Sequence, residues 1–282
     1  MKRRGIMAFI NGTFYSTVME QEVMLDLYLP NDEGKKGITE PVGVIYFLHG
    51  MGSSHKRFRE FTATNRYCLD NKLAIVYINA PMSFYSDMKY GMKYYTYITE
   101  ELPKFLKSAY NLDFPREKTF LAGLSMGGYG TLKIGLNNPD KFGAIAPFSA
   151  PTNLKQMKET MKDQPRESLS TFINVYGEDL EMTDMDDPWA LIKKVSELPA
   201  EQQPRIRLMC GKQDQLANIY LQNVSFDEYA RELPLADYKF MSWKGGHEYM
   251  FWDRAMLHAV AFFLENDYDK ERLTLWRDEG DL

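Results

Sequence analysis

Short apolar runs recur along the chain, and each is followed by a polar loop or by a segment with helical character. The runs lie at residues 42–48, 73–79, 119–122, 143–149, 205–210 and 238–243. Apolar runs of this length are typical of strands that are buried on both faces of a sheet. Helices are predicted at residues 56–71, 94–110, 128–137, 187–198, 223–232 and 253–265. The alternation predicts an α/β fold with a mostly parallel central sheet and helices on both faces.

Other positions indicate where elements begin and end. Residues 14–29 are expected to be extended, and the polar residues 30–37 to form a turn. Pro103 should kink or restart the helix that surrounds it, because proline removes a backbone hydrogen bond and crowds the preceding turn. The pair Asn138-Pro139 should end the helix before it, because a residue that precedes proline disfavours helical geometry.

The least regular part of the chain is residues 150–204, which include a short apolar run at 172–177 of uncertain strand status. A chain of 282 residues is long enough for one large domain with a substantial core. We therefore interpret residues 1–282 as a single domain, in which residues 150–204 form a possible cap or insertion.

Charge and hydropathy exclude some classes of partner. The net charge is −5 and the pI is near 5.5, whereas nucleic acid or an anionic membrane would require a basic face. No stretch approaches the roughly 18 apolar residues of a membrane span. The apolar run at residues 6–10 is too short for a signal-peptide core, so a cytoplasmic location is expected.

The chain contains two cysteines, Cys68 and Cys210. Two cysteines in a chain of this size do not form a disulfide scaffold, and neither lies in a metal-ligand spacing. Both are expected to be buried free thiols, because free cysteine is among the most buried residue types.

A G-x-S-x-G segment at residues 123–127 places Ser125 directly after the apolar run 119–122 and before a predicted helix. A strand, a sharp turn and a helix in this order hold a serine in a strained conformation with its hydroxyl clear of the sheet. Glycines flank the serine because side chains there would collide with the neighbouring strand and helix. The context favours Ser125 as a nucleophile.

A serine hydroxyl needs a base within hydrogen-bond reach and a third group to orient that base. The chain has four histidines. His49 and His55 precede the serine, against the order Ser, Asp or Glu, His that this architecture uses, and His258 lies in an apolar helical run that suits a structural role. His247 follows the last predicted strand, after two glycines, and is predicted to be the general base.

The orienting acid should come from a loop between the serine and the base. Asp214 follows the predicted strand at 205–210 and is the preferred candidate. Asp179 is the alternative, although the apolar run before it lies in the irregular segment.

Attack by a serine on a carbonyl group also needs hydrogen-bond donors for the oxyanion that develops on the substrate. In this architecture one donor is the backbone N–H after the nucleophile, here Met126, and the other comes from the loop after an earlier central strand. The loop His49-Gly50-Met51-Gly52 fits that description. We assign the second donor to Met51, with Gly50 as the alternative.

Five segments together resemble the esterase D / S-formylglutathione hydrolase family of α/β-hydrolases, and most closely its tributyrin esterase branch with acetyl and feruloyl esterase relatives. The similarity extends from about residue 14 to 264. The segments are residues 48–52 (LHGMG), 97–103 (YITEELP), 123–130 (GLSMGGYG), 210–214 (CGKQD) and 246–253 (GHEYMFWD).

The resemblance implies a serine carboxylesterase with the triad Ser125, Asp214 and His247, no cofactor, short-chain acyl esters as substrates, some on carbohydrates, and a possible homo-oligomer. The family often has tryptophan where this chain has Tyr249, so pocket details do not transfer. Cysteine-containing surroundings of the glutathione-thioester branch are missing near Gly50, which disfavours S-formylglutathione as substrate. An acyltransferase of the same fold is the other alternative. A non-catalytic binding module is less favoured because all three triad residues are present.

Overall fold

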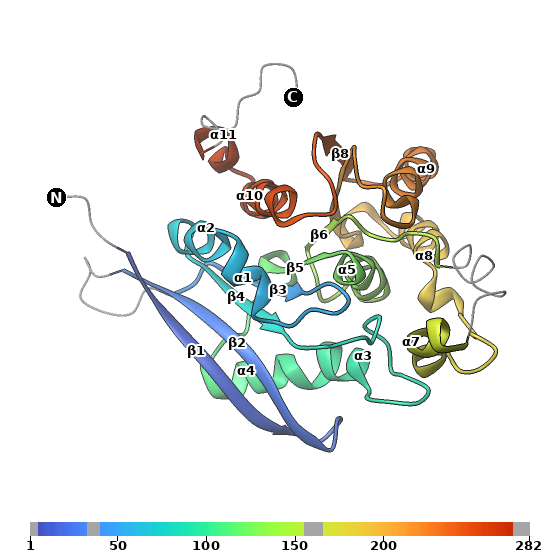
Figure 1. Cartoon of the computed structure of the whole chain (residues 1–282). Helices are drawn as coiled ribbons and strands as arrows, with labels where there is room; N and C mark the ends of the chain where they lie inside the picture. The colour runs from blue at the N-terminus through green and yellow to red at the C-terminus, as the bar shows by residue number, and fades with distance from the viewer. Residues whose placement is uncertain (1–4, 33–39, 155–165, 273–282) are drawn as a thin grey trace.

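The computed structural model describes residues 5–32, 40–154 and 166–272. Within these ranges a single sheet of eight strands has the order β1-β2-β4-β3-β5-β6-β7-β8 (Figure 1). The strands are β1 Gly5–Ser16, β2 Gln21–Asp32, β3 Gly43–Leu48, β4 Leu73–Ile78, β5 Thr119–Leu124, β6 Ala144–Phe148, β7 Arg205–Gly211 and β8 Tyr238–Trp243.

The six strands β3 to β8 are the apolar runs of the sequence, and neighbours among them pair in parallel. The predicted mostly parallel α/β sheet is therefore confirmed. The hairpin of β1 and β2 is antiparallel, and β2 adds antiparallel to β4. The extended segment predicted at 14–29 was too short, because the two strands of this hairpin begin at Gly5 and end at Asp32.

Helices cover both faces of the sheet (Figure 1). The helices α1, α2 and α10 pack on one face, and α4, α5 and α8 on the other. The helical elements are α1 Arg57–Phe61, α2 Thr64–Asp70, α3 Tyr94–Thr96, the π-helix η1 Tyr97–Glu101, α4 Leu102–Tyr110, α5 Met126–Asn137, α7 Arg166–Tyr176, α8 Pro188–Ser196, α9 Ile219–Arg231, α10 Tyr249–Leu264 and α11 Tyr268–Arg272, with short 3-10 turns η2 Arg116–Lys118, η3 Asp184–Asp186, η4 Ala200–Gln202 and η5 Leu216–Asn218. None of the helices in the described ranges is long and apolar enough to cross a bilayer.

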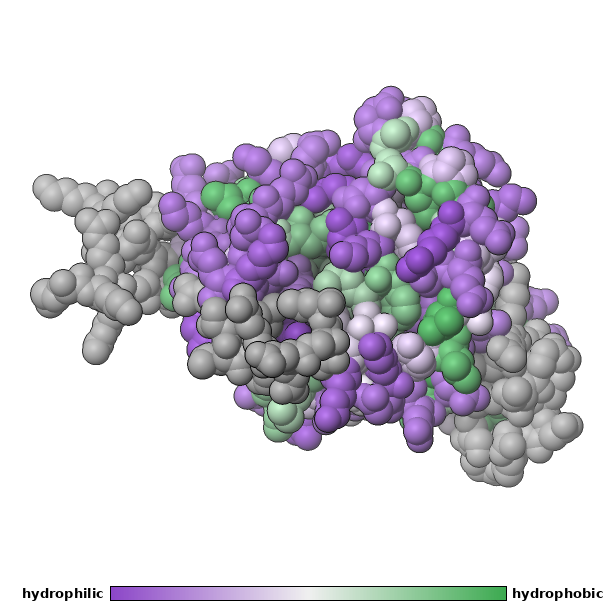
Figure 2. All heavy atoms as spheres, turned by 90° about the horizontal axis from the view of Figure 1, so that it is seen from above, coloured by the Kyte–Doolittle hydropathy of each residue, from purple (hydrophilic) through white to green (hydrophobic). Residues whose placement is uncertain are grey.

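The core consists of two apolar layers, one on each face of the sheet. Strand β3 contributes to both, because successive side chains of a strand point to opposite faces. Val44, Tyr46 and Leu48 pack into one layer, and Ile45 and Phe47 into the other. This explains why the run is continuously apolar and does not alternate. The side of the molecule that carries α9, α10 and α11 is mostly hydrophilic, with an apolar area near its centre (Figure 2).

The single helix predicted at 56–71 is wrong, because the chain forms two helices there, α1 and α2. Thr62 between them is extended, with φ −134° and ψ 164°, and its hydroxyl donates to the Phe58 carbonyl at 2.7 Å. The Ala63 N–H donates to Asp253 Oδ1 of α10 at 2.7 Å. A contact between residues 190 positions apart thus ends one helix and begins the next.

The restart predicted at Pro103 is confirmed, and it takes the form of a π-helical turn, η1, before α4. Proline has no N–H to donate to the carbonyl of Thr99 four residues earlier. That carbonyl instead accepts from Lys141 Nζ at 2.9 Å. The lysine satisfies an acceptor that the proline leaves without its helical partner.

Glu101, the last residue of η1, holds the turn between β1 and β2. Its carboxylate accepts from the backbone N–H and the hydroxyl of Thr17, both at 2.7 Å, and from the hydroxyl of Ser16. Partial burial favours the protonated acid, but the hydrogen bonds from Ser16 and Thr17 outweigh it and lower the pKa of Glu101. The structure therefore needs Glu101 ionised.

Replacement of Glu101 by glutamine should lower the free energy of unfolding at pH 7 by about 1–3 kcal/mol, the usual contribution of hydrogen bonds to a charged group. A lowered folded pKa stabilises the protein above the unfolded value, about 4.3, and this contribution is lost as pH falls through the folded value. Urea unfolding should therefore separate the variant from the wild type more at pH 7 than at pH 3.

Glu100→Gln is the matched control, because Glu100 is exposed and its ion pair with Lys141 lies at the surface. Exposed pairs contribute roughly 0–1 kcal/mol. Equal destabilisation by the two substitutions would contradict the role given to Glu101.

The described part of residues 150–204 is mainly helical, and the run 172–177 is no strand, because it falls at the end of α7. This segment packs on the loop after β4, where Lys89 N–H donates to the Val175 carbonyl and Tyr90 N–H to the Asn174 carbonyl, both at 2.9 Å. Residues 155–165 lie outside the described residues. The cap function of 150–204 stays a prediction.

Candidate active site

Ser125 lies in the turn between β5 and α5, with φ 55° and ψ −120°, which is a strained conformation for a residue with a side chain. A Cβ on Gly123 would come within 2.5 Å of the Gly127 carbonyl oxygen, and one on Gly127 within 2.0 Å of the Leu48 carbonyl oxygen. Both glycines are therefore required sterically, as the sequence predicted. The turn directs the serine hydroxyl to the carboxyl edge of the sheet.

The structure brings Ser125, His247 and Asp214 together in one hydrogen-bonded chain. His247 Nε2 lies 2.9 Å from Ser125 Oγ, and His247 Nδ1 lies 2.8 Å from Asp214 Oδ2. The three residues come from the loops after β5, β7 and β8, which end at the same edge because these strands are parallel. The His247 side chain is 19% exposed and the Asp214 side chain is fully buried.

The loops after β7 and β8 can approach because Gly211 has no side chain. A Cβ there would lie 2.2 Å from the Gly245 carbonyl oxygen. The same carbonyl accepts from the Gln213 N–H at 2.9 Å, and the Gln213 side chain accepts from the Gly245 N–H at 2.7 Å. This pairing fixes the separation between the aspartate and histidine loops.

The alternative acid, Asp179, is not part of this arrangement. It follows the helix α7 and is exposed. The structure therefore places Asp214, and not Asp179, next to the histidine.

An aromatic contact that the sequence analysis did not identify supports the histidine ring. The rings of Trp252 and His247 are arranged edge to face, with their centroids 4.8 Å apart and an interplanar angle of 87°. The indole N–H of Trp252 donates to Ser149 Oγ at 3.1 Å, so the tryptophan is itself held in place. Its position five residues after the histidine, on the first turn of α10, was the available signal.

One predicted oxyanion donor follows Ser125 directly in sequence, and the other belongs to a loop that passes close to Ser125. Met126 is the first residue of α5, where backbone N–H groups have no intrahelical acceptor. The loop after β3 passes close to Ser125, since a Cβ on Gly50 would lie 3.5 Å from Ser125 Cβ and 2.7 Å from Leu124 Cδ1. Met51 follows directly in this loop.

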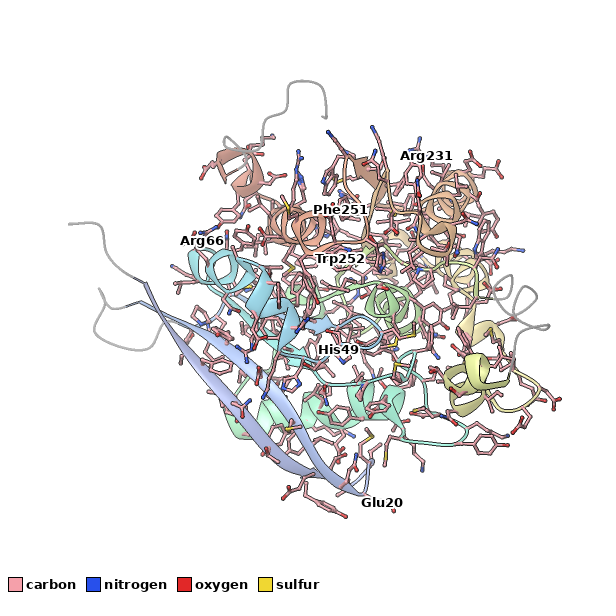
Figure 3. All side chains as sticks on the ribbon, in the orientation of Figure 1. Glu20, His49, Arg66, Arg231, Phe251 and Trp252 are labelled. Atoms are coloured by element: carbon pink, nitrogen blue, oxygen red, sulfur yellow. The ribbon has the colours of Figure 1, made fainter. Side chains whose placement is uncertain are left out.

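His49 is buried at the end of β3, and sequence reasoning assigned it no role. The Ala80 N–H donates to His49 Nε2 at 3.0 Å, so this nitrogen carries the lone pair. The proton is therefore on Nδ1, which donates to the Gly50 carbonyl at 2.8 Å. Burial lowers the pKa of His49 to about 4, which keeps the ring neutral near pH 7. Figure 3 shows the ring in the interior of the molecule.

Tyr85 holds the same loop from the other side. Its hydroxyl donates to the His49 carbonyl at 2.7 Å, and its ring is fully buried. Gly130 leaves room for this ring, because a Cβ there would lie 2.3 Å from Tyr85 Cδ2. Gly130, three residues after the G-x-S-x-G segment, thus makes room for the side chain that holds the His49 carbonyl.

The remaining histidines and the cysteines are not part of the hydrogen-bonded chain of Ser125, His247 and Asp214. His55 is buried within the segment that joins β3 to α1, and His258 of α10 is buried with Nδ1 at 2.8 Å from Asp269 Oδ2. The structural role predicted for His258 fits this contact.

Cys68 and Cys210 are buried free thiols, as predicted, and burial raises the pKa of both. Among the described residues, no group of three or more His, Cys, Asp or Glu side chains could hold a metal ion.

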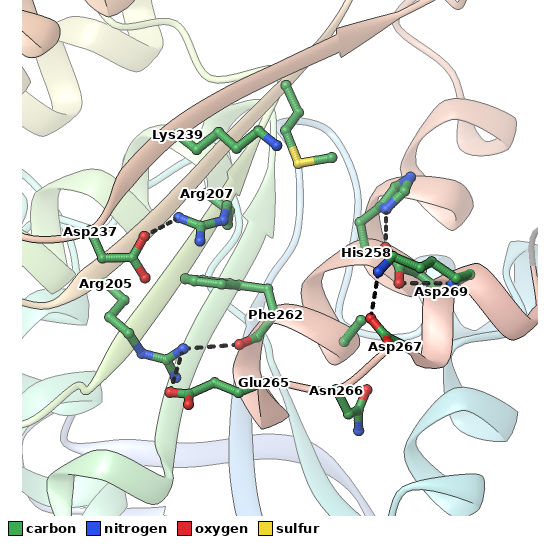
Figure 4. A pocket seen from close by; sticks show the side chains of 13 residues that line it. Arg205, Arg207, Asp237, Lys239, His258, Phe262, Glu265, Asn266, Asp267 and Asp269 are labelled. Atoms are coloured by element: carbon green, nitrogen blue, oxygen red, sulfur yellow. Dashed lines mark hydrogen bonds and ion pairs between the residues drawn. The ribbon is translucent and has the colours of Figure 1, made fainter. Parts of the chain in front are cut away.

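A cavity of about 480 Å³ lies where β7 and β8 begin and α10 ends, and Ser125 is not among its lining residues (Figure 4). Its arginines are already paired. Arg207 bonds Asp237 at 2.6 Å, and Arg205 bonds Glu265 at 3.0 Å. Basic and acidic side chains line the cavity in equal number, and Ser125, Asp214 and His247 are not among its lining residues.

Comparison with known proteins shows similarity to esterases over nearly the whole chain. The sequence profile of the family called Esterase matches residues 16–263. An acetyl esterase of Caldicellulosiruptor saccharolyticus is 25% identical over 265 residues, which are 91% of this chain and 98% of that protein.

Solved structures are also similar to this chain over most of its length. The Staphylococcus aureus fluorophosphonate-binding serine hydrolase FphF, with substrate bound, is 30% identical with a TM-score of 0.77, over 92% of this chain and 98% of its own. S-formylglutathione hydrolase FrmB from Staphylococcus aureus has the same identity and TM-score over 92% of this chain and 99% of its own. A ferulic acid esterase, at 21% identity and a TM-score of 0.69, shares the fold.

Proposed function

This chain belongs to the Esterase family and is a serine carboxylic ester hydrolase, and from that premise we propose that it cleaves short-chain acyl esters through an acyl-enzyme on Ser125. The observation that carries the proposal is the chain of hydrogen bonds from Ser125 Oγ through His247 to Asp214, at 2.9 and 2.8 Å. Both distances lie within the range that proton transfer and ring orientation require.

In the first half-reaction Ser125 Oγ attacks the ester carbonyl carbon while His247 Nε2 takes its proton. The new C–O bond converts the carbonyl to a tetrahedral oxyanion, to which the N–H groups of Met51 and Met126 donate. Collapse breaks the ester C–O bond, and His247 returns the proton to the leaving alkoxide. The products are a free alcohol and the Ser125 acyl ester.

In the second half-reaction water takes the place of the alcohol. His247 accepts a proton from water as the water oxygen attacks the acyl carbon, and then returns that proton to Ser125 Oγ. A free carboxylic acid leaves. Asp214 keeps the imidazole in the tautomer with the proton on Nδ1 and stabilises the imidazolium that forms twice per cycle.

A short acyl group is proposed because the curated relative is an acetyl esterase. Acetyl, butyryl and feruloyl esters, free or on carbohydrates, form the substrate class. Thioester hydrolysis is a second candidate, because a structure that is 30% identical is an S-formylglutathione hydrolase. The same acyl-enzyme would serve both classes.

A panel of acyl esters and a fluorophosphonate probe test the proposal. Wild-type protein should label at Ser125, and kcat/KM should be highest for acetyl or butyryl esters and lower by about tenfold or more for octanoyl esters, which a pocket built for short chains excludes. The panel should include acetylated and feruloylated saccharides and S-formylglutathione. Release of free acid in the presence of added alcohol separates hydrolysis from acyl transfer.

Well-folded protein that resists the probe and turns over no member of the panel would refute the mechanism. A maximum at octanoyl esters would refute the short-chain assignment alone. A kcat/KM for S-formylglutathione well above that for every oxygen ester would favour the thioester candidate.

A further inference from the structure

The backbone donors of an oxyanion hole act only if their N–H groups point at the same place. Met126 is fixed by α5, whereas in the loop that contains Gly50 and Met51 one turn hydrogen bond runs from the Ser53 N–H to the Gly50 carbonyl, at 3.3 Å. Side-chain contacts must add to this bond to set the peptide planes. Two buried side chains, His49 and Tyr85, contact these peptides directly.

We infer that His49 and Tyr85 are positioning residues that hold the two consecutive peptide groups carrying the Gly50 and Met51 N–H groups, and so orient the oxyanion hole. This inference rests on the proposed acyl-enzyme mechanism and deepens it. Neither side chain contacts the reacting atoms in this assignment.

The geometry follows from the planarity of the peptide bond. In a trans peptide the carbonyl and the following N–H point in opposite directions. His49 Nδ1–H holds the Gly50 carbonyl at 2.8 Å, with the Ser53 N–H at 3.3 Å, so the N–H of Met51 must point away from the His49 ring. In the same way the Tyr85 hydroxyl, 2.7 Å from the His49 carbonyl, fixes the direction of the Gly50 N–H.

The two side chains are themselves fixed. The Ala80 N–H holds His49 Nε2 at 3.0 Å, and the ring is 1% exposed. Tyr85 is completely buried, and its N–H donates to Ser83 Oγ at 3.0 Å. The loop after β4, which contains both Ala80 and Tyr85, thereby fixes the loop after β3.

The chemistry of the His49 site distinguishes two replacements. The amide of asparagine lies near the position of Nδ1 and can donate to the Gly50 carbonyl, whereas the amide of glutamine lies near Nε2 and can only serve Ala80. His49→Gln should lower kcat by about 10- to 100-fold with KM changed less than about threefold. The reason is that a misoriented oxyanion hole weakens hydrogen bonds that are made in the transition state. His49→Asn should stay within about threefold of wild type in kcat.

Tyr85→Phe is the second variant, because it removes one hydroxyl and keeps the buried ring. We expect kcat to fall by about 5- to 20-fold, again at nearly constant KM. The control is His258→Gln, which removes another buried histidine, hydrogen-bonded to Asp269, from a site distant from the loop. It should affect thermal unfolding without changing kcat by more than about twofold.

The measurements are kcat and KM on a p-nitrophenyl acetate series and the rate of Ser125 labelling by a fluorophosphonate, each per folded molecule. Labelling should slow in parallel with kcat in His49→Gln and Tyr85→Phe. Wild-type kcat in both variants would overturn the positioning role and leave the esterase mechanism intact. If His49→Gln does not fold, Tyr85→Phe and His49→Asn test the positioning role. An unchanged kcat in Tyr85→Phe, or a 100-fold loss of kcat in His49→Asn, would overturn it. A wild-type protein without turnover or labelling would overturn both proposals.

Discussion

Ser125→Ala is expected to lower kcat by about 10⁶-fold and to abolish labelling by a fluorophosphonate, while KM for the best ester of the panel changes little. The variant removes the Oγ atom that lies 2.9 Å from His247 Nε2, and with it the group that would accept the acyl group. Activity that remains would come from water activated by His247 in an intact oxyanion hole. Steady-state kinetics with active-site titration of the wild type measure this loss.

Ser196→Ala is a suitable control, because Ser196 is a buried serine whose hydroxyl donates to the Lys193 carbonyl at the end of α8. Its activity should equal that of the wild type. If Ser125→Ala kept more than about a hundredth of the activity, a mechanism without an acyl-enzyme at Ser125 would have to replace the one proposed.

Local sequence patterns predicted most of the structure that positions Ser125. The apolar runs gave the parallel strands because a strand buried on both faces has no room for polar alternation. The turn around Ser125 could be predicted because its glycines are required by contacts within a few residues and with the adjacent strand. The proximity of His247 and Asp214 to Ser125 could be predicted because a parallel sheet brings the carboxyl ends of its strands to one edge, whatever their separation in sequence.

Features that depend on partners distant in the sequence could not be predicted from local patterns. The break between α1 and α2 is set by Asp253, which lies 190 residues away from Ala63. Chain order disfavoured His49 as a base, but a pattern of residue types does not reveal that its ring is hydrogen-bonded to the neighbouring Gly50 carbonyl. Its partner Ala80 presents only a backbone N–H, which carries no sequence signal at all.

Asp214→Asn is the second large effect, and we expect kcat to fall by about 10⁴-fold with the serine still in place. Asp214 Oδ2 accepts from His247 Nδ1 at 2.8 Å, so it keeps the Nε2 lone pair directed at Ser125. An asparagine amide can donate to Nδ1 instead, and the proton then moves to Nε2, where it prevents the ring from taking the serine proton. A neutral amide also does not stabilise the imidazolium.

The stability of this variant separates a catalytic defect from a folding defect. Asp214 is 1% exposed and its Oδ1 makes no hydrogen bond among the described residues, so the ionised carboxylate is costly to bury. Asp214→Asn should therefore unfold at a temperature no lower than that of the wild type, although its activity is nearly lost. Asp179→Asn, in an exposed position, is the matched control and should keep full activity. If the control lost activity and Asp214→Asn kept it, the orienting acid would be Asp179, and the His247 loop would have to move in solution to reach it.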